Sequence, residues 1–294
     1  MKRLSLHAFF AALALLMAGC VLFVGCEKDP SQSSNDASSN AGTEASSYCV
    51  FGGDSSAVGM VVVMRDPYAD GVMDWTFKVG DARMLYLYTT RDLQAGGTYP
   101  FVAESGAYGG ANGVYVAMAD MYGEVEFAQG TLEVTVVAGK PEFVVNATSE
   151  DGRSLRLRYK GEVHDLCHPL GSGWCSYGDE RVGIDIAYSQ FYYGLYEYAF
   201  SDTMSSYGVT FYSVAPLASG TYAVSNDMEA VDRGEALDLY LYIEDGDNVL
   251  EGDVANGSAT CTVNGSQISI TFGGDLGGTP ISGSYSGRLE RLAE

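Results

Sequence analysis

The chain contains few positively charged residues, few prolines and few histidines, and these shortages limit its partners, its structure and its chemistry. Its 294 residues hold only 16 Lys and Arg against 38 Asp and Glu, a net charge of −22. Such a balance repels phosphate backbones, so nucleic acid is excluded as a partner. Of only three histidines, the two beyond the leader lie together as His164 and His168. A Ser-His-Asp triad is therefore not expected.

Motifs for phosphate, dinucleotide and nucleophile chemistry are also missing. The sequence has no Gly-x-x-x-x-Gly-Lys loop, no dinucleotide fingerprint before a helix and no Gly-x-Ser-x-Gly elbow. At the nearest match, 283–287, Tyr285 occupies the central position. We predict no cofactor and a non-enzymatic protein. A divergent glycoside hydrolase stays a less favoured alternative, because a pair of carboxylates can be drawn from so many acids.

The residues that are abundant in the chain favour β-structure. Hydrophobic residues make up 47 % of it and aromatic residues 12 %, so real cores can form. With 37 Gly and 21 Tyr but 7 Pro, the composition favours strands and turns over helices.

The first 25 residues are typical of an export leader. Lys2 and Arg3 precede a run from 4 to 24 without any acid. Two cysteines, Cys20 and Cys26, follow a small residue near its end. Both sites resemble the lipobox of bacterial lipoproteins. We favour Cys26 for lipidation, with Cys20 as the alternative, because polar chain begins directly after Cys26.

The stretch from Cys26 to Pro30, Cys-Glu-Lys-Asp-Pro, followed by a Ser/Asn-rich segment, resembles the start of lipoproteins from the Bacteroidota. The resemblance implies a lipid anchor in the outer membrane, on the cell surface or on the periplasmic face. The membrane is thus an expected partner. Residues 26–47 contain no aromatic or large aliphatic side chain and are expected to form a flexible tether.

Beyond the tether the sequence repeats itself. Four landmarks recur in the same order with offsets of 123 to 127 residues. We predict two β units, 48–163 and 175–291, joined by a linker at 164–174. The matching landmarks are Tyr48-Cys49 with Trp174-Cys175, 93–99 with 217–222, 127–130 with 254–257, and 158–161 with 284–287.

Each unit consists of short alternating runs separated by turn pairs such as Asp151-Gly152. In 154–160, for example, Leu155, Leu157 and Tyr159 fall on one face and basic residues on the other. With about eight strands per unit, the pattern predicts an all-β chain of two tandem antiparallel β-sandwiches or small β-barrels.

Four cysteines remain beyond the leader, and an exported chain permits disulfides. Cys49 with Cys167, and Cys175 with Cys261, is the preferred pairing; free buried thiols are the alternative. His164, Cys167, His168 and Cys175 are weak candidates for zinc, but their spacing fits no standard zinc pattern. We therefore predict no metal site.

Tyrosine supplies the candidate binding residues. In 85–88 and 239–242 leucines alternate with tyrosines, so the rings are expected on the face opposite the core. Exposed rings suit stacking on sugars or contact with a protein partner. We predict a binding role for a glycan, or for an envelope or host protein; a periplasm-facing structural or assembly lipoprotein is the alternative. The candidate residues are Tyr86, Tyr88, Tyr192, Tyr193, Tyr240 and Tyr242.

Overall fold

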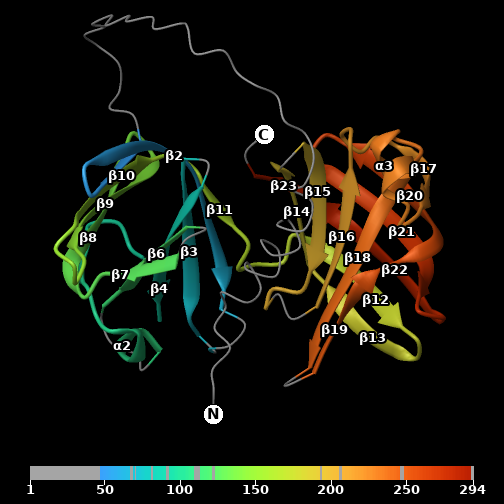
Figure 1. Cartoon of the computed structure of the whole chain (residues 1–294), viewed down its shortest axis with the longest axis horizontal. Helices are drawn as coiled ribbons and strands as arrows, with labels where there is room; N and C mark the ends of the chain where they lie inside the picture. The colour runs from blue at the N-terminus through green and yellow to red at the C-terminus, as the bar shows by residue number, and fades with distance from the viewer. Residues whose placement is uncertain are drawn as a thin grey trace, which may run out of the picture. The chain divides into compact units, whose positions relative to one another are not determined.

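The structure is a computed structural model that describes residues 47–292, except 67–68, 70, 81, 91–92, 109–112, 121–122, 193, 205–206 and 246–247. Cys20, Cys26 and the tether up to residue 46 lie outside the described residues. The described chain forms two curled sheets of 11 and 12 strands (Figure 1). The predicted all-β class with two units is therefore confirmed. None of the described helices is long and apolar enough to cross a bilayer.

The first half, which we define as 48–165, holds the first sheet and one short helix. Its strand order is β5-β8-β9-β10-β1-β2-β3-β4-β6-β7, with β11 pairing with β2. The elements are β1 Tyr48–Phe51, β2 Asp54–Arg65, β3 Met73–Val79, β4 Arg83–Thr89, β5 Gly97–Pro100, α2 Glu104–Tyr108, β6 Tyr115–Asp120, β7 Gly123–Glu126, β8 Gln129–Val137, β9 Lys140–Thr148, β10 Ser154–Lys160 and β11 Val163–Asp165.

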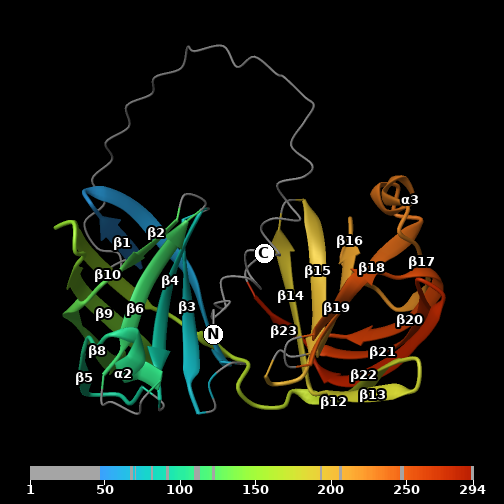
Figure 2. The same cartoon turned by 60° about the horizontal axis from the view of Figure 1, so that its bottom comes forward.

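The second half, 171–291, holds the second sheet and one short helix (Figure 2). Its strand order is β13-β12-β22-β21-β20-β17-β18-β16-β15-β14-β23, with β19 pairing with β18. The elements are β12 Gly171–Tyr177, β13 Glu180–Ile184, β14 Ile186–Tyr192, β15 Leu195–Ser201, β16 Tyr207–Ser213, β17 Gly220–Val224, α3 Met228–Asp232, β18 Ala236–Asp245, β19 Asn248–Asp253, β20 Ala255–Asn264, β21 Gln267–Leu276, β22 Thr279–Arg288 and β23 Glu290–Arg291.

The two sheets follow one plan. The run β5-β8-β9-β10-β1 of the first sheet corresponds to β17-β20-β21-β22-β12 of the second, and β2-β3-β4-β6-β7 corresponds to β14-β15-β16-β18-β19. A turn contact recurs as well. Tyr99 Oη accepts the Gln94 N–H at 2.8 Å, and Tyr222 Oη accepts the Ala218 N–H at 3.0 Å. Each tyrosine thus fastens the start of its own strand to the preceding loop.

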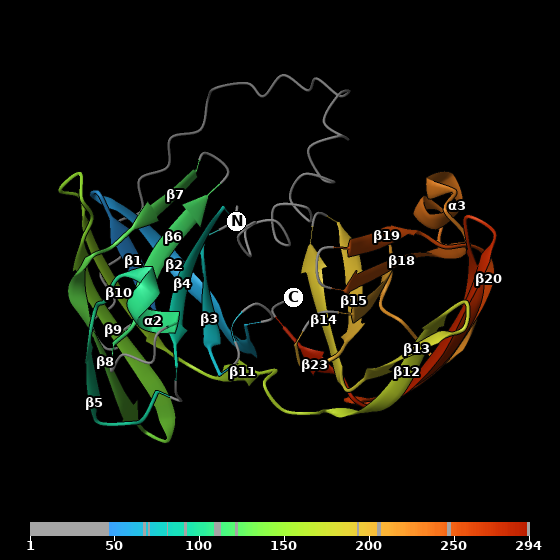
Figure 3. The ribbon, with the colours of Figure 1, turned by 90° about the horizontal axis from the view of Figure 1, so that it is seen from below.

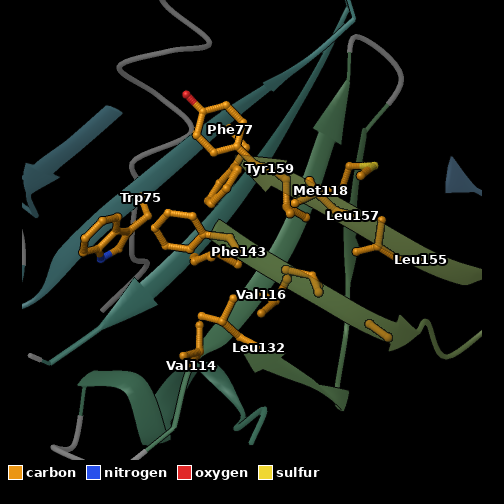
Figure 4. Close-up of a cluster of buried hydrophobic side chains, with 14 of the residues drawn as sticks. Trp75, Phe77, Val114, Val116, Met118, Leu132, Phe143, Leu155, Leu157 and Tyr159 are labelled. Carbon is orange, nitrogen blue, oxygen red and sulfur yellow. The ribbon is translucent and has the colours of Figure 1, made fainter. Parts of the chain in front are cut away.

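Each half buries its own core. In the first half, Phe77 on β3 meets Phe143 and Tyr159 edge-on, at ring distances of 5.4 and 6.0 Å (Figure 4). In the second half, Phe200 on β15 meets Tyr285 at 5.4 Å. These side chains alternate along their strands with residues on the other face, as the two-residue period requires.

A smaller buried cluster joins the two halves. It contains Met60 and Val62 from β2, Ile186 from β14, and Leu166 and Leu292, which follow β11 and β23. β11 lies parallel to β2, and β23 lies parallel to β14 in the same manner. The predicted linker is consequently too long: 163–165 belongs to the first sheet and 171–177 to the second, because both ends find strands to pair with.

Strand order rules out the preferred disulfide pairing: the four cysteines are buried thiols, and no disulfide joins them. Cys175 on β12 and Cys261 on β20 are separated by β22 and β21, about 14 Å along the sheet. Cys49 pairs with Ser56 near the start of β2. The Cys167 carbonyl accepts a hydrogen bond from Arg65 Nε at the end of β2. The two cysteines are therefore about 30 Å apart along β2. A disulfide needs Cα atoms within about 7 Å.

The four thiols are expected to be inert in the native protein. Burial raises the pKa of Cys49 to about 11 and that of Cys175 to about 12, so little thiolate exists at neutral pH. A thiol reagent at pH 8 should label none of them in fragment 44–294 and all four in guanidinium chloride. Labelling of only two after unfolding without reductant would show that a disulfide forms.

Candidate functional site

The outer face of the second sheet gathers tyrosines and carboxyl groups. On β18, Leu239 and Leu241 point into the core and are fully buried. Tyr240 and Tyr242 point the opposite way and are half-buried, as the alternation predicts. Because β14, β15, β16 and β18 are hydrogen-bonded neighbours, their outward side chains form rows across the sheet.

One such row, the acid–tyrosine row, consists of Gln190, Glu197, Tyr212 and Asp238. Gln190 lies opposite Glu197, Glu197 opposite Tyr212, and Tyr212 opposite Asp238. Glu197 and Asp238 are thus two strand spacings apart, about 10 Å between backbones. The row combines an amide, two carboxyl groups and an aromatic ring on one face.

Glu197 is the deepest member of the row, with only 4 % of its surface exposed. Gln190 Nε2 donates to Glu197 Oε2 at 3.0 Å. Burial nevertheless dominates and raises the pKa of Glu197, while the Gln190 hydrogen bond opposes that shift. A carboxyl group this deeply buried, between Gln190 and Tyr212 on neighbouring strands, is not needed for solubility.

Asp238 ends the row under a similar constraint. Burial, and then the negative charge of Asp253, raise the pKa of Asp238 to about 6. Its Oδ1 is buried and has no hydrogen-bond partner in the part of the chain that the structure describes. A buried acceptor without a donor is unfavourable, so a hydroxyl or N–H group that gained access to this atom would remove that cost.

The tyrosines complete the chemistry of the face. Tyr240 Oη donates to Glu251 Oε2 at 2.8 Å. Burial, and then this hydrogen bond, raise the pKa of Tyr240. Burial and the nearby charge of Glu197 also raise the pKa of Tyr212. Both phenols therefore remain protonated at physiological pH. The face offers acceptors on the acids and flat apolar tyrosine rings between them, while the Tyr240 hydroxyl is already used by Glu251.

In the corresponding row of the first half, the tyrosine rings are buried. It runs Met64, Asp74, Tyr88, Tyr115. Tyr86 and Tyr88 are only 8 % and 3 % exposed, so the prediction that these rings are exposed is wrong. One physical reason is mutual cover: Tyr86 stacks on Tyr88 at 6.3 Å, and Tyr88 packs on Tyr115 at 5.7 Å.

A buried acid occupies equivalent positions in both halves. Asp74 is fully buried and accepts a hydrogen bond from Thr76 Oγ1 at 3.2 Å, and it corresponds to Glu197 in strand position. Packing of the core does not require an acid on the outward face, yet both units have one at this position although their sequences otherwise differ.

Tyr193 and the side chain of Tyr192 lie outside the described residues. Their neighbour Phe191 is 40 % exposed and packs against Tyr196 at 4.8 Å. The sequence pattern missed Gln190, Glu197, Tyr212 and Asp238, since single outward polar residues are ordinary in strands.

The weak zinc candidates are scattered. Cys167 belongs to the core of the first half and Cys175 to that of the second. His164 Nδ1 lies 2.7 Å from Glu290 Oε1, and His168 Nδ1 lies 3.0 Å from an oxygen of Asp165. Among the described residues no three His, Cys, Asp or Glu side chains converge on a metal position.

No family model and no curated protein matches the chain. One solved structure with a detectable likeness is a protein of unknown function from the DUF3598 family of Nostoc punctiforme PCC 73102. It is 10 % identical over 83 % of this chain and 93 % of its own, with a TM-score of 0.19. A likeness at that TM-score carries no argument about function.

Proposed function

We propose that the chain is a non-catalytic lipoprotein of the outer membrane that binds a glycan on the outer face of its second half. The observation that carries the proposal is the acid–tyrosine row, in which Asp238 Oδ1 is buried without a donor. Sugar hydroxyls can donate hydrogen bonds to such carboxyl groups. The apolar faces of sugar rings pack on tyrosine rings such as that of Tyr240. The acidic surface disfavours anionic glycans, so the ligand we infer is neutral.

Binding is tested on fragment 44–294 with a panel of neutral and acidic oligosaccharides, measured by calorimetry. Tyr240→Ala is expected to weaken binding of a neutral glycan at least about tenfold, because an aromatic contact residue is lost. Tyr48→Ala is the matched control: this half-buried tyrosine lies on β1 of the first half. Equal affinity of the two variants, or binding of protein partners only, would contradict the glycan proposal.

The anchor is tested separately. Cys26→Ser is expected to abolish incorporation of labelled fatty acid and release the protein from membranes, whereas Cys20→Ser leaves both unchanged. A stable anchor needs more than one acyl chain, as the lipoprotein signal supplies. Protease treatment of intact cells then distinguishes surface exposure, in which the second half is digested, from a periplasmic location. Loss of labelling in Cys20→Ser alone would reassign the lipidated residue.

A further inference from the structure

A cavity of about 150 Å³ lies in the second half, on the core side of its sheet. β14, β15 and β23 line it, and these three strands are neighbours at one end of the strand order (Figure 3). In the β14–β15 ladder Phe191 lies opposite Tyr196, and Ser189 lies opposite Tyr198, so the four side chains share one face. Tyr198 belongs to the core of this half, which makes that face the inner one. The acid–tyrosine row lies on the opposite face.

Backbone contacts hold the rest of the lining in place. The Leu289 N–H donates to the Ser266 carbonyl at 2.7 Å, and Arg291 Nη2 donates to the Gly265 carbonyl at 3.3 Å. Both bonds fasten the β20–β21 turn to the chain that follows β22, so the cavity exists before any ligand arrives. The lining from this side and from the loop before β17 includes Pro216, Leu217, Val263, Leu289, Arg291 and Leu292.

The cavity carries positive charge in a strongly acidic chain. Arg291 is the sole charged residue among the described residues that line it, although the chain has a net charge of −22. The adjacent acid, Glu290, is engaged elsewhere: its carboxylate lies 2.7 Å from His164 Nδ1 and 2.8 Å from Arg288. A guanidinium has several N–H donors, so donors beyond the one used by Gly265 remain for a ligand.

Tyr198 adds a second donor at the inner end of the cavity. Its Oη accepts the Leu217 N–H at 2.8 Å, which leaves the hydroxyl proton to be donated in turn. Burial raises the pKa of Tyr198, although the Leu217 N–H and the charge of Arg291 oppose that shift. The phenol is therefore neutral at physiological pH. A phenol and a guanidinium on one cavity match the two oxygens of a carboxylate.

The first half has the same strand plan without these groups. β11 pairs with β2 as β23 pairs with β14. By that correspondence Asp165 takes the place of Arg291, and Arg65 takes the place of Phe191. Arg65 Nε donates to the Cys167 carbonyl at 3.1 Å, so this cation serves the fold. The plan thus requires neither a cation at position 291 nor an exposed ring at position 191.

We propose that this cavity binds a small monocarboxylate whose apolar body is about the size of one aromatic ring. Its carboxylate would contact Arg291 and Tyr198, and its body would pack on Phe191 and Tyr196. A protein cavity of roughly 150 Å³ holds a benzene ring, so long acyl chains and larger ring systems do not fit. Salt screens the net negative charge beyond about 8 Å, whereas Arg291 is in contact with the ligand.

The test is an NMR chemical-shift titration of fragment 44–294 with phenylacetate. Saturable binding is expected with a Kd of about 1 mM or lower, given about ten non-hydrogen atoms in the ligand. Phenylacetamide has the same shape without the charge and is expected to bind at least about fivefold more weakly. Phenethylamine, which carries the opposite charge, should bind more weakly still.

Two variants place the ligand in the cavity. Arg291→Gln is expected to weaken phenylacetate at least about fivefold and to leave phenylacetamide unchanged. Arg156→Gln, at an exposed residue of β10, makes the same change in net charge and should leave phenylacetate unchanged. Phe191→Ala should weaken both probes alike, since it removes part of the apolar wall.

The result is independent of the glycan proposal. Tyr240→Ala should leave phenylacetate binding unchanged, because Tyr240 lies on the outer face. Equal affinity for phenylacetate and phenylacetamide, equal affinity of Arg291→Gln and Arg156→Gln for phenylacetate, or absence of saturation up to about 10 mM would each overturn the carboxylate site.

Discussion

Replacing Phe77 by alanine is expected to lower the free energy of unfolding of the first half by about 3–5 kcal/mol. Phe77 is fully buried and is the ring on which Phe143 and Tyr159 both pack. Its removal leaves a cavity that the surrounding strands cannot fill, because β3 is fixed by ladders to β2 and β4 on either side. A small all-β unit has little stability to spare, so most molecules should unfold at modest urea concentrations.

The two tryptophans allow the loss of stability to be assigned to one half of the protein. Trp75 reports on the first core, and Trp174 lies in the second half. With Trp174→Phe as the background, urea unfolding followed through Trp75 should show the full shift. With Trp75→Phe it should show a much smaller one, since the cores are separate. Val136→Ala, at a side chain 54 % exposed, is the control and should change stability by less than about 0.5 kcal/mol. A loss below about 1 kcal/mol for the Phe77 variant would contradict this description of the core.

Local alternation predicted the core well because a strand's two-residue period is a property of the chain itself. Leu85 and Leu87 are fully buried, and so is Leu155, on the face that the sequence assigned to the core. The all-β class followed from the same pattern. These features depend on neighbours two residues away and need no knowledge of the sheet.

Other features depend on pairing between distant segments, which a single sequence does not reveal. The preferred disulfides were wrong because strand order, not repeat position, sets the distance between Cys175 and Cys261. The burial of Tyr86 and Tyr88 was missed because these rings cover each other and pack on Tyr115 of the neighbouring strand β6, which the alternation within one strand does not reveal. The acid–tyrosine row needed the register across four strands before Glu197 and Asp238 could be placed together.

The acid at position 238 leads to the second large prediction. Its pKa rises from 3.8 to about 6 in the folded chain, so the folded state holds a proton that the unfolded state has already released. As pH rises from 4 to 7 the carboxyl group therefore removes stability. The full shift corresponds to about 3 kcal/mol, and partial exposure of Asp238 reduces this to about 1–2 kcal/mol.

Asp238→Asn should thus stabilise the second half at pH 7.5 by about 1–2 kcal/mol and have almost no effect at pH 3.5, where aspartate is protonated in both states. Urea unfolding monitored through Trp174 across this pH range measures the difference. Asp232→Asn, at an exposed acid on α3, is the control and should be neutral to within about 0.5 kcal/mol.

Asp238→Asn is also expected to weaken glycan binding, so that stability rises while affinity falls. A side chain that destabilises the fold at neutral pH is retained for something other than the fold. If Asp238→Asn instead lowered stability at pH 7.5, the carboxylate would be serving the sheet itself through contacts with its neighbours. The buried Oδ1 would then no longer argue for an external donor, and the acid–tyrosine row would lose the observation on which the proposed function rests.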